Sequence, residues 1–133
     1  MKIAVSSNGK DLNAMVDARF GRCPYFIIAE IEGNEIKGFE VIENQSASAF
    51  RGAGIQAAQT VANKGVEAVI TGNMGPNAFS VLSQTGIKIF FAFGITVKDA
   101  IEKYLKGELS EIKQPGFGAG RGFGRGMGRG RGF

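Results

Sequence analysis

Short apolar runs, each bounded by glycine or polar residues, recur along the chain. Runs of about four to eight residues with this pattern predict buried β-strands. The five predicted strands cover residues 2–6, 24–31, 35–42, 66–71 and 87–91. The second and third are joined by Gly33 and Asn34, a pair that accepts the positive φ angles of a tight hairpin turn. These two strands are therefore expected to be antiparallel.

Between and after the later strands, apolar residues recur at helical spacing. The predicted helices cover residues 53–64, 76–85 and 97–105. Gly65 and Gly86 follow the first two helices and are typical terminators. Pro76 occupies a first helical position, where its missing N–H is tolerated. Thr96 is expected to cap the third helix, with Asp99 at the capping-box position.

The order of these elements is a strand, a hairpin, and then helices alternating with strands, which is typical of an α/β protein. Right-handed crossovers make the later strands parallel. The prediction is a three-layer α/β/α domain over residues 1–114, with a five-stranded mixed sheet in which the second strand is antiparallel. If the other strands run the same way, the loops that leave them emerge at one edge of the sheet, where ligands bind in open α/β folds.

The chain has 133 residues and a formal net charge of +4, and this charge is unevenly distributed. The C-terminal segment, residues 115–133, contains Arg121, Arg125, Arg129 and Arg131 and no acidic residue, so the domain before it is neutral overall. Glycine occupies nearly every second position of this segment, which excludes a packed core. The segment is therefore predicted to be a disordered tail.

Cysteine and histidine usage limits the chemistry. Cys23 is the only cysteine, so the chain cannot form an internal disulfide, and nothing indicates an oxidising compartment. The chain turns polar at Ser6, too early for a signal peptide, and no apolar run approaches the roughly 20 residues of a membrane span. A cytoplasmic protein outside the membrane is expected. Histidine is absent, which removes the commonest general base and argues against most enzyme classes.

The predicted edge of the sheet gathers arginines and glycines from several loops. Guanidinium groups, exposed backbone N–H groups and a helix dipole together favour an anionic guest. The alternative is that the glycines serve turns and the arginines face solvent. The candidate binding residues are Arg19, Arg22, Cys23, Arg51, Gly52, Gly54, Asn73 and Met74.

Cys23 is the candidate metal ligand among them. Its neighbour Arg22 favours the thiolate, a soft ligand for iron, copper or molybdenum–sulfur species, although a small residue at a strand start explains this position equally. One cysteine cannot hold an ordinary iron–sulfur cluster, so a cluster must bring most of its own ligands or be shared between subunits. Asn73 and Met74 lie in a strand-to-helix loop without nucleotide-binding spacing, and Met74 offers either a thioether or packing.

Three motifs occur in order along residues 1–112: RFGRCPYF at 19–26, GAGIQAAQ at 52–59 and GNMGPNAF at 72–79. Together they resemble the dinitrogenase iron–molybdenum cofactor biosynthesis family. The resemblance implies a ribonuclease H-like α/β/α fold and a non-enzymatic role in binding or carrying an iron–molybdenum cofactor precursor or related metal–sulfur cluster. Cluster-donor or cluster-acceptor proteins would then be its partners.

This chain departs from the family pattern at one place. Many members carry a histidine in the loop where this chain reads SASAFR at residues 46–51. The departure favours non-covalent capture of an anionic cluster, with Cys23 as at most one ligand.

Two other functions compete with cluster binding. The implied fold is shared with nucleases, but that chemistry needs several carboxylates around a divalent metal, typically one on the first strand, and residues 2–6 have none. Asp11 and Asp17 are predicted to be solvated turn residues.

The alternative function is nucleic-acid interaction through residues 115–133, whose arginines and phenylalanines can contact phosphates and stack on bases. With four phosphate contacts, such binding would be weak at physiological salt.

Overall fold

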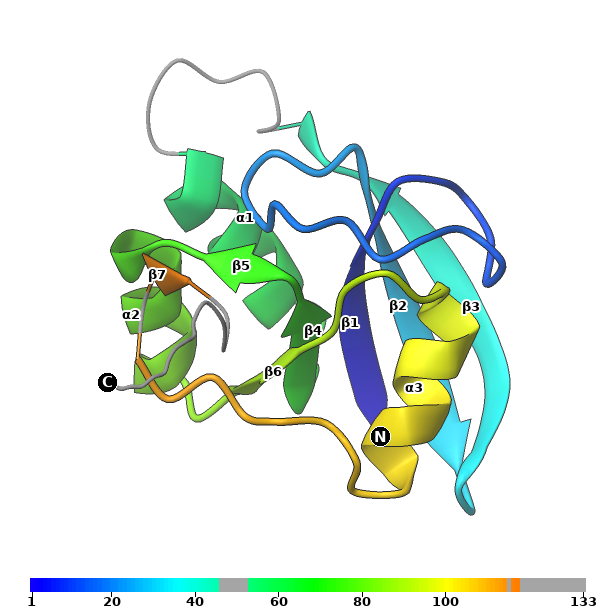
Figure 1. The fold of residues 1–133 in the computed structure, drawn as a ribbon. Helices are drawn as coiled ribbons and strands as arrows, with labels where there is room; N and C mark the ends of the chain where they lie inside the picture. The colour runs from blue at the N-terminus through cyan, green and yellow to red at the C-terminus, as the bar shows by residue number, and fades with distance from the viewer. Residues whose placement is uncertain (46–52, 115, 118–133) are drawn as a thin grey trace.

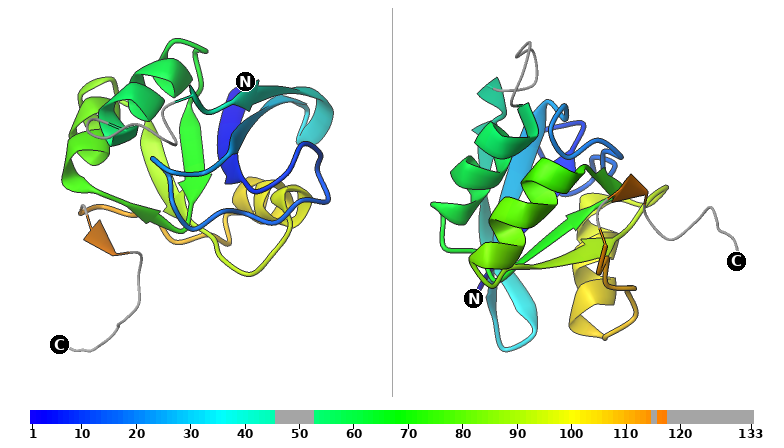
Figure 2. Two further views of the ribbon diagram at one scale, coloured as in Figure 1. Left: turned by 90° about the horizontal axis from the view of Figure 1, so that it is seen from above. Right: turned by 90° about the vertical axis from the view of Figure 1, so that its left-hand side faces the viewer.

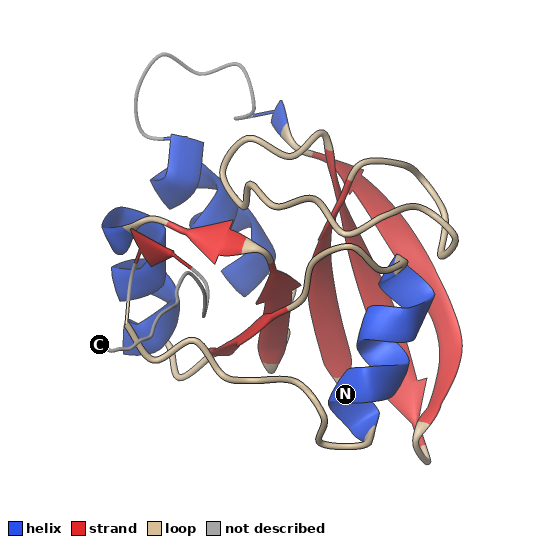
Figure 3. Cartoon of the chain, viewed as in Figure 1, coloured by secondary structure: helices blue, strands red, loops and turns tan. Residues whose placement is uncertain are grey.

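The computed structural model describes residues 1–45, 53–114 and 116–117 (Figure 1). Figure 3 shows the same view coloured by secondary structure. The elements in chain order are β1 (Lys2–Ser7), β2 (Tyr25–Glu32), β3 (Glu35–Glu43), α1 (Ala53–Ala62), β4 (Ala68–Thr71), β5 (Asn73–Met74), α2 (Pro76–Gln84), β6 (Lys88–Phe91), α3 (Val97–Leu105) and β7 (Gly116–Phe117).

Five of the strands form one mixed sheet in the order β3-β2-β1-β4-β6. β1 pairs in parallel with β4, and β4 pairs in parallel with β6. β2 is antiparallel to both of its neighbours, β1 and β3, so β3 points the same way as β1. The predicted α/β fold, with a five-stranded mixed sheet and an antiparallel second strand, is confirmed. The carboxyl ends of β1, β3, β4 and β6 consequently share one edge of the sheet.

Helices cover both faces of this sheet (Figure 2). Ile3 and Ile27 belong to the core that includes residues of α3, whereas their neighbours Ala4 and Ile28 belong to the core that includes residues of α1 and α2. This alternation follows from the two-residue period of a strand. Burying a large aliphatic side chain contributes about 1.5–3 kcal/mol, so the two cores hold the layers in place.

Local signals at turns and helix ends have the predicted effect. Gly33 and Asn34 have φ angles of 59° and 66°, as the hairpin between β2 and β3 requires. Pro76 opens α2 within its first two positions. The Thr96 hydroxyl accepts a hydrogen bond from the Asp99 backbone N–H at 3.1 Å, which confirms the cap of α3. These positions orient the helices relative to the sheet edge.

A second, two-stranded sheet was not predicted. In it, Asn73 of β5 lies opposite Phe117 of β7, and Met74 lies opposite Gly116, in antiparallel register. The prediction of disorder from residue 115 onward is therefore wrong for Gly116 and Phe117. Backbone pairing needs no apolar side-chain pattern, so the glycine-rich sequence gave no sign of it. The rest of the predicted tail, with the arginines considered for nucleic-acid contact, lies outside the described residues.

Candidate functional site

Loops from distant parts of the chain meet at the carboxyl edge of the sheet. The Phe20 backbone N–H donates to the carbonyl oxygen of Asn73 at 3.3 Å. The side-chain amide of Asn44 donates to the carbonyl oxygens of Gly21 and Cys23, at 3.2 and 2.8 Å. These bonds join the loop before β2 to the end of β3 and to β5. The predicted convergence of loops is confirmed for the described residues.

A pocket of about 280 Å³ lies where these loops meet the amino termini of α1 and α2. A Cβ atom added to Gly21 would lie 3.1 Å from the Gly54 Cα, and one added to Gly54 would lie 3.4 Å from the Ala78 Cβ. Glycine at position 21 thus lets the loop approach the start of α1 closely, whereas a Cβ on Gly54 would make an ordinary van der Waals contact with Ala78. The lining residues are Phe20, Gly21, Arg22, Ala53, Gly54, Ile55, Gly75, Pro76, Asn77 and Ala78.

The electrostatic character of the pocket comes from helix ends and one arginine. Neither α1 nor α2 has an acidic residue in its first turn. Gly75, the N-cap residue of α2, makes no side-chain hydrogen bond to the first turn. Both helices therefore direct partial positive charge toward the pocket, and the exposed residue Arg22 adds a full charge. Because none of the described lining residues carries a carboxylate, the pocket favours anions.

Cys23 is buried and does not line this pocket. Its exposed fraction is 0%, and its thiol donates to the Phe20 carbonyl oxygen at 3.3 Å, while the Asn44 amide donates to Sγ at 3.8 Å. Burial, together with the negative charge of Asp17, raises the pKa of the thiol to about 12. The predicted thiolate is therefore wrong for this conformation, because desolvation outweighs any effect of the neighbouring arginine. The alternative of a small buried residue describes Cys23 better.

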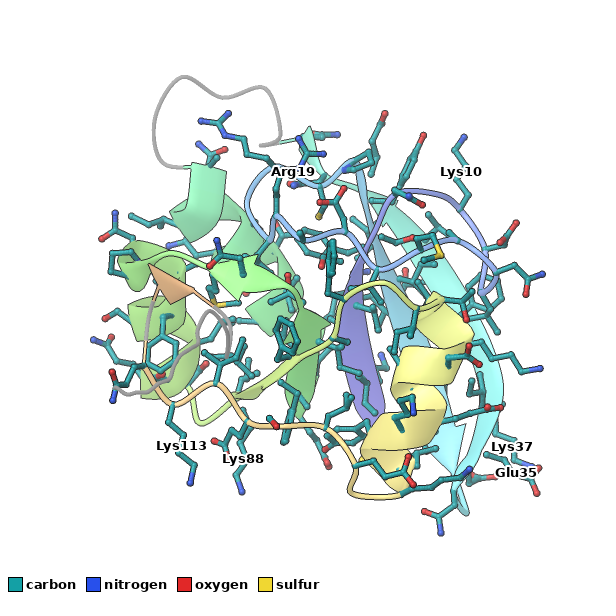
Figure 4. All side chains as sticks on the ribbon, viewed as in Figure 1. Lys10, Arg19, Glu35, Lys37, Lys88 and Lys113 are labelled. Atoms are coloured by element: carbon teal, nitrogen blue, oxygen red, sulfur yellow. The ribbon has the colours of Figure 1, made fainter. Side chains whose placement is uncertain are left out.

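Arg19 forms an ion pair with Asp17. Its Nε and Nη2 atoms donate to the two carboxylate oxygens of Asp17, both at 3.1 Å. This hydrogen bonding and the charge of Asp17 raise the pKa of Arg19. The Asp17 side chain is only 8% exposed, so its prediction as a solvated turn residue is wrong. Arg19 lies on the same edge of the sheet as the pocket but not among its lining residues (Figure 4).

The other predicted site residues separate into four groups. Gly54 lines the pocket, as Arg22 does. Met74 is 1% exposed within the core beneath α1 and α2, so it packs and does not present a thioether to a guest. Asn73 is exposed and takes part through its backbone carbonyl, outside the pocket lining. Arg51 and Gly52 lie outside the described residues.

Some residues that build the pocket were not predicted as part of it. Gly75 and Asn77 line its α2 side, and Gly21 and Asn44 close the loop over α1. A signal for the first two was present, because a glycine–proline pair before a helix marks an uncapped amino terminus. Asn44 gave a weaker signal, because it lies two residues after a predicted strand that ends at the same edge.

Residues 1–45, 53–114 and 116–117 contain neither a metal-binding cluster of side chains nor a membrane-spanning helix. There, no group of three or more histidine, cysteine, aspartate or glutamate side chains could hold a metal ion. In the same ranges, no helix has the length and apolar character needed to cross a membrane.

Relatives of known sequence match most of the chain. A protein of Methanocaldococcus jannaschii is 39% identical over 113 residues, which is 85% of this chain and 92% of the relative. A second protein of that organism is 30% identical over 115 residues, which is 86% of this chain and 97% of the relative. The similarity thus extends through the whole sheet and its helices.

Solved structures agree with the fold. The apo form of the orange protein from Desulfovibrio gigas matches with a TM-score of 0.80 and 34% identity, covering 86% of this chain and 94% of that protein. A NifB-like protein from Thermotoga matches with a TM-score of 0.71 and 42% identity, covering 83% and 91%. The model of the family described as dinitrogenase iron-molybdenum cofactor matches residues 1–107. The chain belongs to the dinitrogenase iron-molybdenum cofactor family.

Proposed function

We propose that this protein binds and carries an anionic metal–sulfur cluster, either a precursor of the iron–molybdenum cofactor or a related cluster. The observation that supports this most directly is the convergence of two helix amino termini, both without first-turn acidic residues, with Arg22 around one pocket. Backbone N–H groups at helix ends are a general means of binding anions. Membership of the family adds the association with iron and molybdenum chemistry.

The size of the pocket suits a compact guest. Pockets for organic ligands and cofactors have volumes of about 300–1,000 Å³. The volume here, about 280 Å³, lies below that range. A small polyanion that supplies its own sulfide ligands fits such a space better than a nucleotide would, and it would need only hydrogen-bond donors from the protein.

Capture by charge is favoured over direct coordination. To serve as a ligand, Cys23 must lose its proton, and its thiol pKa is raised to about 12. At pH 7 the free-energy cost of that deprotonation is roughly 7 kcal/mol, since one pKa unit corresponds to about 1.4 kcal/mol. Arg22 and the helix ends carry their charge without such a cost. Cys23 is therefore proposed to support the loop, with a ligand role only after the loop opens.

A carrier role also fits the residues better than catalysis. The whole chain lacks histidine. In the described part, Asp17 is already held by Arg19 and the Cys23 thiol is buried and protonated, so neither serves as a ready base or nucleophile. The cluster is cargo in this proposal, to be received from a donor protein and passed to an acceptor protein.

The first experiment identifies the cargo. The protein is purified anaerobically from its native host, and its visible spectrum and its iron, molybdenum and copper contents are measured. The proposal expects a coloured protein with stoichiometric metal and sulfide. A colourless, metal-free protein that also fails to bind an added cluster would contradict it.

The second experiment tests the pocket with tetrathiomolybdate as the probe, titrated anaerobically. Arg22→Gln should weaken binding by roughly tenfold, because one charge-assisted contact is lost. Lys98→Gln is the matched control: it also removes one exposed positive charge, but from α3 on the opposite face of the sheet. Equal effects of the two substitutions would show that only overall charge matters and would contradict a site at the pocket.

A further inference from the structure

The pairing of β2 with β3 ends at Pro24 and Asn44. Tyr25 lies opposite Glu43, and one position further the Asn44 backbone N–H donates to the Pro24 carbonyl oxygen at 2.9 Å. Proline has no N–H, so Pro24 cannot return a second ladder bond. Asn44 is only 7% exposed, and its side chain bonds to the residues that precede Pro24. The end of β3 is therefore joined to the loop that contains Arg22.

The Asn44 side-chain amide holds the backbone on both sides of Arg22. It donates to the carbonyl oxygen of Gly21 at 3.2 Å and to the carbonyl oxygen of Cys23 at 2.8 Å. A side-chain amide has two N–H hydrogens, so one is available for each carbonyl. One acceptor belongs to the residue before Arg22 and the other to the residue after it. The position of the Arg22 backbone thus depends on a buried side chain at the end of β3.

Gly21 makes such a restraint necessary. A Cβ added to Gly21 would lie 3.1 Å from the Cα and N atoms of Gly54, so the loop contacts the start of α1 through its backbone. Glycine has the greatest backbone freedom of all residues. A glycine directly before Arg22 would let that side chain sample many positions unless the loop were held. The Asn44 amide holds it from the side of the sheet.

We infer that Asn44 is a positioning residue for the guest, because it fixes the backbone around Arg22 and so keeps the guanidinium group at the pocket. This inference rests on the proposed function, since it concerns the anion site at the same pocket. Asn44 is not among the lining residues, so it acts through the loop and does not touch the guest. A donor that is already held in place loses less conformational freedom on binding, and the affinity is higher for that reason.

The test is a double-mutant cycle with tetrathiomolybdate as the probe, titrated anaerobically. The four full-length proteins are the wild type, Asn44→Ala, Arg22→Gln and the double variant. Asn44→Ala should weaken binding by roughly threefold to tenfold, which is no more than the loss caused by Arg22→Gln. In the Arg22→Gln background, Asn44→Ala should change the affinity by less than about twofold, because the group that Asn44 positions is already absent.

Two further variants separate positioning from a general loss of stability. Thr96→Ala removes the cap of α3, whose residues do not line the pocket, so it should destabilise the fold without a matching loss of affinity. Asn44→Ser is a milder change that keeps a hydroxyl group. If circular dichroism shows that Asn44→Ala does not fold, the cycle is repeated with Asn44→Ser, and the same dependence on Arg22 is expected.

The outcomes distinguish this inference from the proposed function. If the wild type does not bind the probe, or if Arg22→Gln binds it like the wild type, the pocket site fails and the inference fails with it. If Arg22→Gln weakens binding but the Asn44 variants bind like the wild type, the inference alone is wrong. Equal losses from the Asn44 substitution in both backgrounds would mean that Asn44 acts independently of Arg22. An equal loss in Thr96→Ala would mean that stability is the cause, and either result overturns the positioning role.

Discussion

Arg22 and Cys23 are adjacent in sequence, yet one side chain is exposed and the other is buried. Arg22 is exposed and lines the pocket between α1 and α2. Cys23 is fully buried, and its thiol is bonded to the Phe20 carbonyl in the core beneath the same loop. One side of this loop therefore carries charge beside the pocket, and the other side fixes the loop to the sheet. Charge and not sulfur is the accessible chemistry of the site.

The amino termini of α3 and α2 also differ, because one is capped and the other is not. The amino terminus of α3 is capped by the Thr96 side chain and has Asp99 in its first turn. The amino terminus of α2 has Gly75 as its cap residue and no first-turn acidic residue. A capped end satisfies its N–H groups internally, whereas an uncapped end leaves them for solvent or a ligand. This contrast favours the amino terminus of α2 over that of α3 as the proposed anion site.

The largest expected effect concerns the reactivity of Cys23. Only the thiolate is alkylated, and at neutral pH a thiol of pKa about 12 is roughly a thousandfold less ionised than one of pKa 9. Iodoacetamide should therefore label the native protein at least a thousandfold more slowly than the protein unfolded in urea, as measured by mass spectrometry. A short cysteine peptide, labelled in both solvents, controls for the effect of urea. A native rate near that of the peptide would mean that Cys23 is open to metal ligation.

The next prediction places a negative charge at the open helix end. Gly75→Asp should weaken tetrathiomolybdate binding by roughly tenfold to a hundredfold, because the new carboxylate would bond the first-turn N–H groups and repel the guest. Space is available, since no atom lies within 4 Å of an added Cβ. Gly75→Asn is the matched control, because it can cap the helix without adding charge. If the asparagine variant loses as much affinity as the aspartate variant, charge repulsion is not the cause.

Sequence alone predicted the parts of the fold that depend on local signals. The hairpin at Gly33 and Asn34, the proline start of α2 and the Thr96 cap each follow from the conformational or hydrogen-bonding preference of one or two residues. The directions of the strands followed from the hairpin and from the alternation of helices with strands. These predictions needed no knowledge of which residues meet in space, and the structure confirms them.

The site was only partly predictable, because its properties are tertiary. Arg22 was correctly placed near a helix end, but the burial of Cys23 depends on the loop that Asn44 holds down. Likewise, the burial of Asp17 beneath Arg19 and the pairing of Phe117 with Asn73 join residues through contacts that leave no periodic pattern. The sequence motifs indicated which loops hold the candidate site residues. They did not indicate which of those side chains are accessible.

The third prediction uses pH to test the burial of Cys23. Its folded-state pKa of about 12 lies above the ordinary value of 9.0, so the protonated thiol stabilises the fold below pH 9, and this contribution is lost as pH rises toward 12. At pH 10 the loss is on the order of 1 kcal/mol. Urea denaturation at pH 7 and pH 10 should show that Cys23→Ala loses less stability than the wild type between these two values. Identical pH dependence of the two proteins would mean that the thiol ionises normally.

The smallest expected effect concerns the capped amino terminus of α3. Thr96→Ala removes the oxygen that accepts the Asp99 N–H, and it should lower the free energy of unfolding by about 1 kcal/mol in urea denaturation. Thr96→Ser keeps that oxygen and should recover most of the loss. Affinity for tetrathiomolybdate should stay within about twofold of wild type in both variants, because the cap of α3 uses its N–H groups internally and its residues do not line the pocket. If Thr96→Ala weakened binding as much as Gly75→Asp, the affinity would depend on the stability of the whole sheet edge and not on the uncapped amino terminus of α2.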